Sequence, residues 1–172
     1  HGATLRIAGA AASQLGVVNG YRDPARLGAD RWAALIAAHA IGTGAKLVVG
    51  AGTALTVDAL EASGRFRGGI IVPGPDLMRG ALASRTAGLP LAAGAFQEFP
   101  DNTEDAIASG ALQACVGAIQ RMRHAMSGNG MAPEHVIVSG GAARALAPLL
   151  PMAFSIHENL VLDGLARIAR LA

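Results

Sequence analysis

The residues of this 172-residue chain that are best suited to chemistry are glycines, hydroxyl side chains and a few acids. Asp30 and Arg31 are adjacent at the predicted start of a helix, where the carboxylate could accept a proton and the guanidinium could hold an anionic substrate. They could equally be solvated side chains on a first helical turn, because adjacent helical positions point about 100° apart and do not pair. Their spacing alone leaves both interpretations open.

A second candidate is the segment from Gly50 to Asp58. An apolar strand over residues 47–49 runs into Gly52-Thr53, and the chain then alternates to Asp58 without room for a helix. Backbone N–H groups and the Thr53 hydroxyl at such a corner could hold a phosphate. The segment has neither the helix of a dinucleotide fingerprint nor the lysine of a P-loop. An ordinary tight hairpin corner explains the same residues.

Two further candidates lie at the ends of predicted elements. Ser139-Gly140-Gly141 comes at the end of an apolar strand over residues 135–139, where glycines let a ligand approach the backbone closely. A plain strand-to-helix turn explains this segment equally well. Thr103 follows Asn102 at the start of the longest predicted helix, ahead of acidic residues near the positive end of the helix dipole. Taken alone, Thr103 is simply part of a helix cap.

Composition narrows the class of protein. Hydrophobic residues make up 52% of the chain and charged residues 15%, which predicts a globular protein with one core or two small ones. The net charge is +2 and the basic residues are scattered, so nucleic acid is not expected as the main partner. No apolar run reaches membrane-spanning length, and no signal segment opens the chain. We therefore expect a cytoplasmic protein without a membrane partner.

Cysteine and histidine usage bears on two kinds of feature, disulfides and metal sites. The single cysteine, Cys115, excludes an intramolecular disulfide. It falls in an apolar helical pattern that predicts a buried structural thiol in a reducing compartment, with a catalytic thiol as the alternative. The five histidines are isolated from one another in the sequence, so no histidine-based metal site is indicated.

The elements that must position these candidates form an α/β pattern. A boundary between two lobes is expected at Gly42-Thr43-Gly44, which divides the chain into residues 1–42 and 43–172. The predicted strands are 5–7, 17–18, 47–58 with its return strand 65–72, 135–139 and 154–157, and the predicted helices are 30–41, 76–85, 102–126, 142–147 and 160–171.

A set of motifs follows along the chain in this order: Tyr21-x-x-Pro24-x-x-Leu27-Gly28-x-Asp30-Arg31-Trp32, Gly52-Thr53-Ala54-x-Thr56-x-Asp58, Gly68-Gly69-x-Ile71-x-Pro73-Gly74, Thr86-x-x-Leu89-Pro90, Asn102-Thr103-x-x-Ala106-Ile107-x-x-Gly110, Ser139-Gly140-Gly141 and Leu160-x-Leu162-x-Gly164-Leu165. In this order and spacing they closely resemble the type III pantothenate kinase family, which also includes proteins named Bvg accessory factors. The resemblance covers essentially the whole chain.

The resemblance implies an actin-like, ribonuclease H-like fold of two lobes with ATP in the cleft. Residues 1–42 would be the end of the first lobe, and residues 43–172 would be the second. The implied reaction is the ATP-dependent phosphorylation of pantothenate to 4'-phosphopantothenate, the first step of coenzyme A synthesis. Mg²⁺ would travel with ATP rather than occupy a protein cage.

Residue roles follow from the same resemblance. Asp30 would be the proton acceptor, and Thr103 would reach pantothenate from the neighbouring subunit of a homodimer. The remaining contacts would be Tyr21, Gly28, Ala29, Asp30 and Arg31 for pantothenate, and Gly52, Thr53, Gly140 and Gly141 for ATP.

The chain departs from the family in two places. Relatives carry a cation-binding aspartate three residues before the threonine of the Gly-Thr pair, where this chain has Gly50, which puts a requirement for potassium or ammonium in doubt. Relatives also begin with an Asp-x-Gly-Asn-Thr/Ser phosphate loop, and this sequence lacks that first part of the family pattern. Both departures motivate an alternative, a non-catalytic regulatory or binding protein on the same fold.

Overall fold

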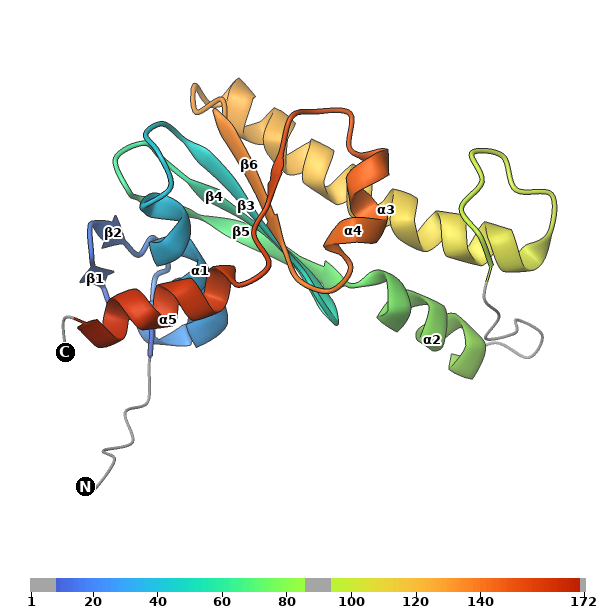
Figure 1. Cartoon of the computed structure of the whole chain (residues 1–172), viewed down its shortest axis with the longest axis horizontal. Helices are drawn as coiled ribbons and strands as arrows, with labels where there is room; N and C mark the ends of the chain where they lie inside the picture. The colour runs from blue at the N-terminus through green and yellow to red at the C-terminus, as the bar shows by residue number, and fades with distance from the viewer. Residues whose placement is uncertain (1–8, 86–93, 171–172) are drawn as a thin grey trace, which may run out of the picture.

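The computed structural model describes residues 9–85 and 94–170, whose centre is a five-stranded mixed sheet with helices on both faces (Figure 1). The sheet order is β5-β4-β3-β6-β7. Its strands are β3 (Lys46–Ala51), β4 (Ala54–Leu60), β5 (Phe66–Pro73), β6 (His135–Ser139) and β7 (Ser155–Ile156), and a separate two-stranded hairpin joins β1 (Ser13–Gln14) to β2 (Val17–Val18). The strand predicted at 5–7 lies outside the described residues.

Strand β3 is the central strand, and its two neighbours run in opposite directions to each other. Its pairing with β4 is antiparallel and places Gly50 opposite Thr56, as the predicted hairpin requires. Its pairing with β6 is parallel and places Gly50 opposite Ser139. Because side chains alternate along a strand, Val48 and Gly50 share one face of the sheet while Leu47 and Val49 share the other.

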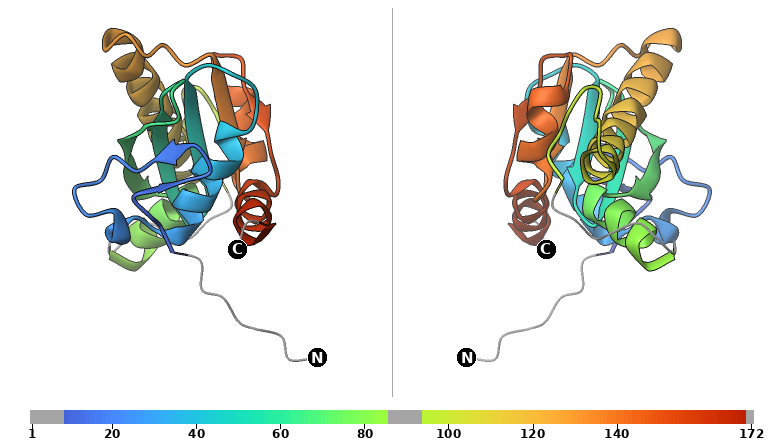
Figure 2. Two further views of the ribbon diagram at one scale, coloured as in Figure 1. Left: turned by 90° about the vertical axis from the view of Figure 1, so that its left-hand side faces the viewer. Right: turned by 90° about the vertical axis from the view of Figure 1, so that its right-hand side faces the viewer.

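The helices cover both faces of the sheet, and Figure 2 shows α3 and α5 on opposite sides of the strands. Leu47 and Val49 pack with Cys115 and Ile119 of α3, whereas Val48 packs with Trp32 of α1. The helices are α1 (Ala29–His39), α2 (Pro75–Arg85), α3 (Thr103–Gly128), α4 (Ala143–Leu146) and α5 (Leu160–Arg170), with 3-10 turns at Pro24–Arg26 and Ala147–Leu149.

Helices α1 and α5 pack closely because α5 carries a glycine at the contact. A Cβ atom on Gly164 would lie 1.9 Å from the carbonyl oxygen of Ala33, so only glycine allows this approach. On the core side of α1, Trp32 is fully buried and its Nε1 donates a hydrogen bond to Oε1 of Gln14 at 2.9 Å. The contact brings the starts of α1 and α5 to the same side of the sheet.

The predicted helices and strands within the described residues are confirmed, with differences at their ends. Helix α1 ends at His39 rather than at residue 41, and β7 has only two residues. The short helix predicted over 142–147 is divided into α4 and a 3-10 turn that contains Pro148, because proline has no N–H to continue an α-helix. None of the described helices combines the length and apolar character needed to cross a bilayer.

Candidate active site

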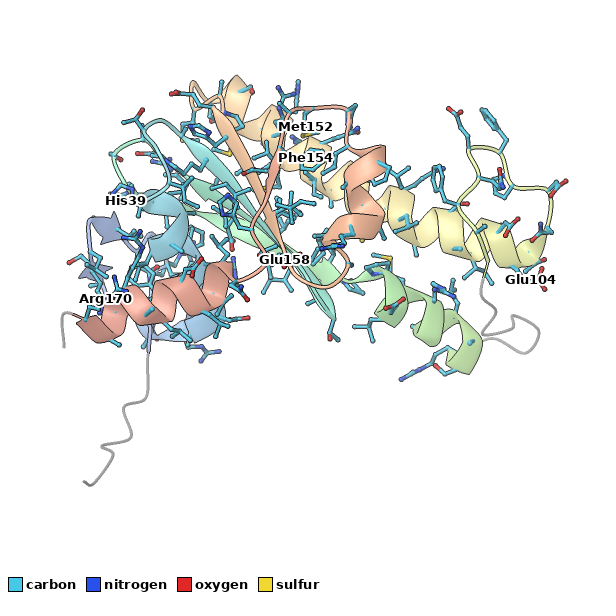
Figure 3. All side chains as sticks on the ribbon, viewed as in Figure 1. His39, Glu104, Met152, Phe154, Glu158 and Arg170 are labelled. Atoms are coloured by element: carbon cyan, nitrogen blue, oxygen red, sulfur yellow. The ribbon has the colours of Figure 1, made fainter. Side chains whose placement is uncertain are left out.

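A cavity of about 410 Å³ opens on the α1/α5 face of the sheet, at the carboxyl ends of β3 and β6. Open α/β sheets bind ligands beyond the carboxyl ends of parallel strands. Figure 3 shows Glu158, a rim residue, near the end of β6. The lining comprises Asp30, Arg31, Ala34, Val48, Gly50–Ala54, Thr56, Asp58, Ser139, Gly140 and Glu158–Leu162.

Most of the predicted site residues meet in this cavity. Asp30 and Arg31 come from α1, Gly52 and Thr53 from the hairpin corner, and Gly140 from the turn after β6. Gly141 lies beside it, in a smaller cavity that shares Gly140 and Glu158 with the main cavity.

The glycine corner forms the predicted tight hairpin turn, and it also lines the cavity. It is a tight hairpin turn, since the N–H of Gly52 donates to the carbonyl of Ala54 at 3.1 Å and the N–H of Gly74 donates to that of Thr53 at 2.8 Å. It also forms one wall of the cavity, with Gly52 and Thr53 exposed. The turn therefore presents the Thr53 side chain to the cavity on a rigid backbone.

Gly140 forms the opposite wall because of its backbone conformation. Its φ is +97°, and a Cβ atom there would lie 2.4 Å from the carbonyl oxygen of Ala51. The N–H of Ala142 donates to that same carbonyl at 3.0 Å. The ends of β3 and β6 are thus held together, and the polar groups of the two turns face one space.

The cavity also receives the starts of two helices, one of which we did not predict as part of the site. Asp30 lies in the first turn of α1, and Asn159 and Leu160 lie at the beginning of α5. Helix starts favour anions, because their N–H groups are unpaired and the dipole is positive there. The sequence predicts the helix that begins at Leu160 but contains no signal for its place beside α1, which depends on the packing of Gly164.

Arg31 is tied to a partner that the sequence did not reveal. Its Nε donates to Oδ2 of Asp58 at 3.1 Å, and its Nη2 forms an ion pair with Oδ1 of the same carboxylate. The two side chains are 6% and 3% exposed. Burial raises the pKa of Asp58, while the hydrogen bond and charge of Arg31 oppose that rise. Burial likewise disfavours the charged Arg31, but Asp58 outweighs it and raises the pKa of the guanidinium.

Tyr21 contacts Arg31 and lies outside the lining of the main cavity. Nη1 of Arg31 donates to the Tyr21 hydroxyl at 2.7 Å. The guanidinium carbon lies 5.6 Å from the Tyr21 ring centroid and 5.7 Å from that of Phe66, within range of a cation–π interaction. Tyr21 therefore helps to hold Arg31, whichever ligand the cavity takes.

Gly28 and Ala29 form the beginning of helix α1. Gly28 is the N-cap, and its carbonyl accepts a hydrogen bond from the N–H of Trp32 at 3.0 Å. A Cβ atom on Gly28 would lie 2.6 Å from Oδ1 of Asp30, so the glycine leaves room for the exposed carboxylate. Both residues shape the approach to Asp30, although neither lines the main cavity.

Thr103 lies elsewhere within a single chain. It lines a groove of about 470 Å³ between α2 and α3, with Met78, Leu82 and Ile107. Figure 3 shows the next residue, Glu104, far from Glu158 of the main cavity. The helix is capped by Asn102, whose Oδ1 accepts from the N–H of Asp105 at 2.9 Å. A role for Thr103 in this kind of cavity therefore requires a second subunit.

The described residues offer no cluster of three or more histidine, cysteine, aspartate or glutamate side chains that could hold a metal ion. Within the cavity, Asp58 is already engaged by Arg31. Gly50, between Thr56 and Ser139 on the neighbouring strands, supplies no carboxylate. The three carboxylates of the cavity lining, Asp30, Asp58 and Glu158, therefore form no such cluster.

The mixed sheet, the two helix starts and the exposed carboxylate define an α/β protein with a polar cavity at the carboxyl ends of β3 and β6. Residues 1–125 match the family described as type III pantothenate kinase. The chain is 54% identical over 161 residues to the type III pantothenate kinase of Aromatoleum aromaticum and 48% identical over 162 residues to that of Laribacter hongkongensis. It belongs to the type III pantothenate kinase family.

The matches cover 94% of this chain but only 66% and 68% of those two relatives. A crystal structure of a conserved Baf family protein from Campylobacter jejuni, described as a transcriptional activator, is similar with a TM-score of 0.62 at 26% identity. That similarity covers 85% of this chain and 65% of the other. The chain thus spans about two thirds of the length of the proteins it matches.

Proposed function

We propose that the protein transfers the γ-phosphoryl group of ATP to the primary hydroxyl of pantothenate, which yields 4'-phosphopantothenate for coenzyme A synthesis. The observation that carries this proposal is the single cavity in which the Asp30 carboxylate, the Arg31 guanidinium and the Thr53 hydroxyl meet, in a chain of the type III pantothenate kinase family. Relatives that are about half identical to this chain over the matched residues bear that enzyme's name.

Asp30 is the proposed proton acceptor. It is exposed at the start of α1 and lines the cavity, so a substrate hydroxyl can reach it. Phosphoryl transfer has a loose transition state, and most of the catalysis comes from positioning and charge neutralisation. A carboxylate of ordinary basicity is therefore sufficient to orient the hydroxyl and take its proton late.

Arg31 is the proposed partner of the pantothenate carboxylate, with Tyr21, Gly28 and Ala29 around it. The guanidinium lines the cavity beside Asp30 while its rear face is held by Asp58. A fixed guanidinium binds a carboxylate with charge-assisted hydrogen bonds and little further ordering.

ATP is proposed to lie against Gly52, Thr53, Gly140 and Gly141, with its phosphates toward the starts of α1 and α5. Both glycine turns border open space at the carboxyl ends of the strands. Mg²⁺ would be held chiefly by the ATP phosphates, since the described residues offer no carboxylate cage. It would neutralise phosphate charge. Gly50 has no side-chain carboxylate for potassium or ammonium, so we propose that this chain works without a monovalent cation held by a carboxylate at this position.

The lobes and compartment are proposed on the same basis. Residues 43–172 would form the second lobe of an actin-like fold, and residues 1–42 the end of the first. The order β5-β4-β3-β6-β7, an antiparallel hairpin followed by parallel crossovers, supports this assignment. Synthesis of coenzyme A supports a cytoplasmic location.

The homodimer is proposed to bring Thr103 of one subunit to the pantothenate site of the other. Mixing inactive Asp30→Asn with inactive Thr103→Val subunits is expected to restore about a quarter of wild-type activity, because half of the dimers are mixed and each has one intact site. ADP release after subunit exchange measures this. Mixtures that stay as inactive as either variant would show that Thr103 and Asp30 act within one subunit.

ADP release coupled to a spectrophotometric assay tests the function itself. The full-length protein with ATP, Mg²⁺ and pantothenate is expected to release ADP only when pantothenate is present, and equally in sodium and potassium buffers. Mass spectrometry should find a product heavier than pantothenate by one phosphoryl group.

A non-catalytic regulatory protein is the alternative. The similarity to a Baf family protein described as a transcriptional activator favours it. Under this alternative, the full-length protein would bind pantothenate or ATP in calorimetry and release no ADP.

A further inference from the structure

We infer that Asp58, with the space left by Gly69, is a positioning residue that aims Arg31 at the carboxylate of the substrate. This inference rests on the proposed function. Asp58 would act through Arg31 and would not itself bind substrate, since its side chain is only 3% exposed.

The first observation is the division of the Arg31 donors. A guanidinium has five N–H groups in a fixed plane. One on Nε and one on Nη2 go to the two oxygens of Asp58, and one on Nη1 goes to the Tyr21 hydroxyl. Two N–H groups, one on each terminal nitrogen, have no partner in the part of the chain that the structure describes. Arg31 lines the cavity, so these two are the donors left for a ligand.

The second observation is that the residue opposite Asp58 on the neighbouring strand is a glycine, which leaves space for the ion pair. Gly69 of β5 is the register partner of Asp58. A Cβ atom on Gly69 would lie 1.9 Å from Oδ1 of Asp58 and 3.0 Å from Nη2 of Arg31. It would also lie 2.5 Å from the carbonyl oxygen of Val57, so any larger residue would collide with the strand backbone and displace the Asp58 carboxylate.

The third observation is the rigidity of the surroundings. Asp58 lies inside a strand that is paired on both sides, and Phe66 beneath the guanidinium is fully buried. A buried ion pair is weak support for stability as such, because desolvation offsets much of the attraction. Here the ion pair acts on geometry, because it fixes the two remaining N–H groups of Arg31 in position before the ligand binds.

The test compares pantothenate with its alcohol analogue, in which a hydroxymethyl group replaces the carboxylate. In the full-length protein, Asp58→Asn is expected to lower the preference for pantothenate over the alcohol about tenfold or more, in kcat/KM and in calorimetric affinity. Most of the loss should lie in KM for pantothenate, with a smaller change in kcat. Tyr21→Phe, which removes one neutral hydrogen bond, should shift the preference in the same direction by a smaller factor.

Glu61→Gln is the matched control. It removes one carboxylate next to β4. Oε1 of Glu61 lies 3.3 Å from Nη1 of Arg67, whose side chain is 51% exposed, so the substitution is expected to leave the preference for pantothenate over the alcohol unchanged. The NMR signal of the Arg31 Nε–H adds a readout that needs no ligand. Its proton should exchange with solvent slowly in the wild type and at least about tenfold faster in Asp58→Asn, because the hydrogen bond that protects it is weakened.

The outcomes separate the inference from the proposed function. If kcat/KM falls by the same factor for pantothenate and for the alcohol in Asp58→Asn and in Tyr21→Phe, Asp58 is only structural and the inference is wrong, whereas the kinase assignment stands. If the wild type shows no turnover but its binding preference collapses in Asp58→Asn, the kinase assignment fails and the inference stands. An unchanged preference with unchanged Nε–H exchange would also overturn it.

Discussion

Replacing Asp30 with asparagine in the full-length protein is expected to lower kcat for pantothenate phosphorylation about 10²–10⁴-fold, the usual contribution of a positioned base. Asparagine keeps the size and the hydrogen-bonding oxygen of the side chain but cannot take the proton. Because Asp30 is exposed at a helix start, the fold should be unaffected. Steady-state ADP release and the thermal unfolding midpoint check the two halves of this prediction.

Asp163→Asn is the matched control for Asp30→Asn. Asp163 also lies in the first turn of a helix, α5, and it is exposed, but it is not part of the lining of the main cavity. Its replacement is expected to leave kcat near the wild-type value. Normal turnover by Asp30→Asn would remove Asp30 from the mechanism, and an equal loss in both variants would point to a general charge effect.

Replacing Arg31 with methionine is expected to lower the free energy of unfolding by about 3–5 kcal/mol at neutral pH, because it leaves the carboxylate of Asp58 buried without its cation. The pair of Arg67, which is exposed, and Glu61, which is half-buried, provides the comparison. Arg67→Met should cost only about 0–1 kcal/mol. Urea denaturation of both variants measures the difference.

The destabilisation of Arg31→Met should depend on pH. Without Arg31, burial and the nearby negative charge of Asp30 act unopposed and raise the pKa of Asp58 further above its ordinary value. A carboxyl whose pKa is raised by folding contributes stability below its unfolded-state pKa, and this stability is lost as the pH rises through its folded-state pKa. The deficit relative to the wild type should therefore be smaller at about pH 4.5 than at about pH 7.5.

The double variant Arg31→Met/Asp58→Asn isolates the buried charge as the cause. Removing both charges is expected to recover part of the stability and to abolish the pH dependence, since breaking one half of a buried pair costs more than replacing both halves. A double variant that is no more stable than Arg31→Met at neutral pH would show that lost packing, not the carboxylate, accounts for the deficit.

The elements of this fold were predictable because their signals are local. The alternation from residue 47 to 58 and the turn before Arg65 predict the hairpin of β3, β4 and β5. Asn102 predicts the start of α3, and its side chain does cap that helix. Helix ends were less certain, as at α4, where Pro148 and the tertiary packing divide the predicted helix.

Part of the candidate site was predictable because several of its residues stand where a helix or strand begins or ends. Asp30, Thr53 and Gly140 each stand at the end of an element, and the carboxyl ends of parallel strands meet at one edge of a sheet. Their motif order indicated the family, which the comparisons confirm. Their individual roles remain predictions, as do the lobe boundary at residue 42 and the contribution of Thr103 to a neighbouring subunit.

By itself, the sequence determined the elements, because each depends on neighbours a few positions away, and it indicated the family through the order of its motifs. Only the tertiary structure decided which side chains meet. Arg31 and Asp58 are 27 positions apart, and their pairing depends on α1 lying over β4 and on the missing side chain of Gly69. The start of α5 reaches the cavity only because Gly164 packs against Ala33. Such contacts join distant segments, and no local pattern encodes them.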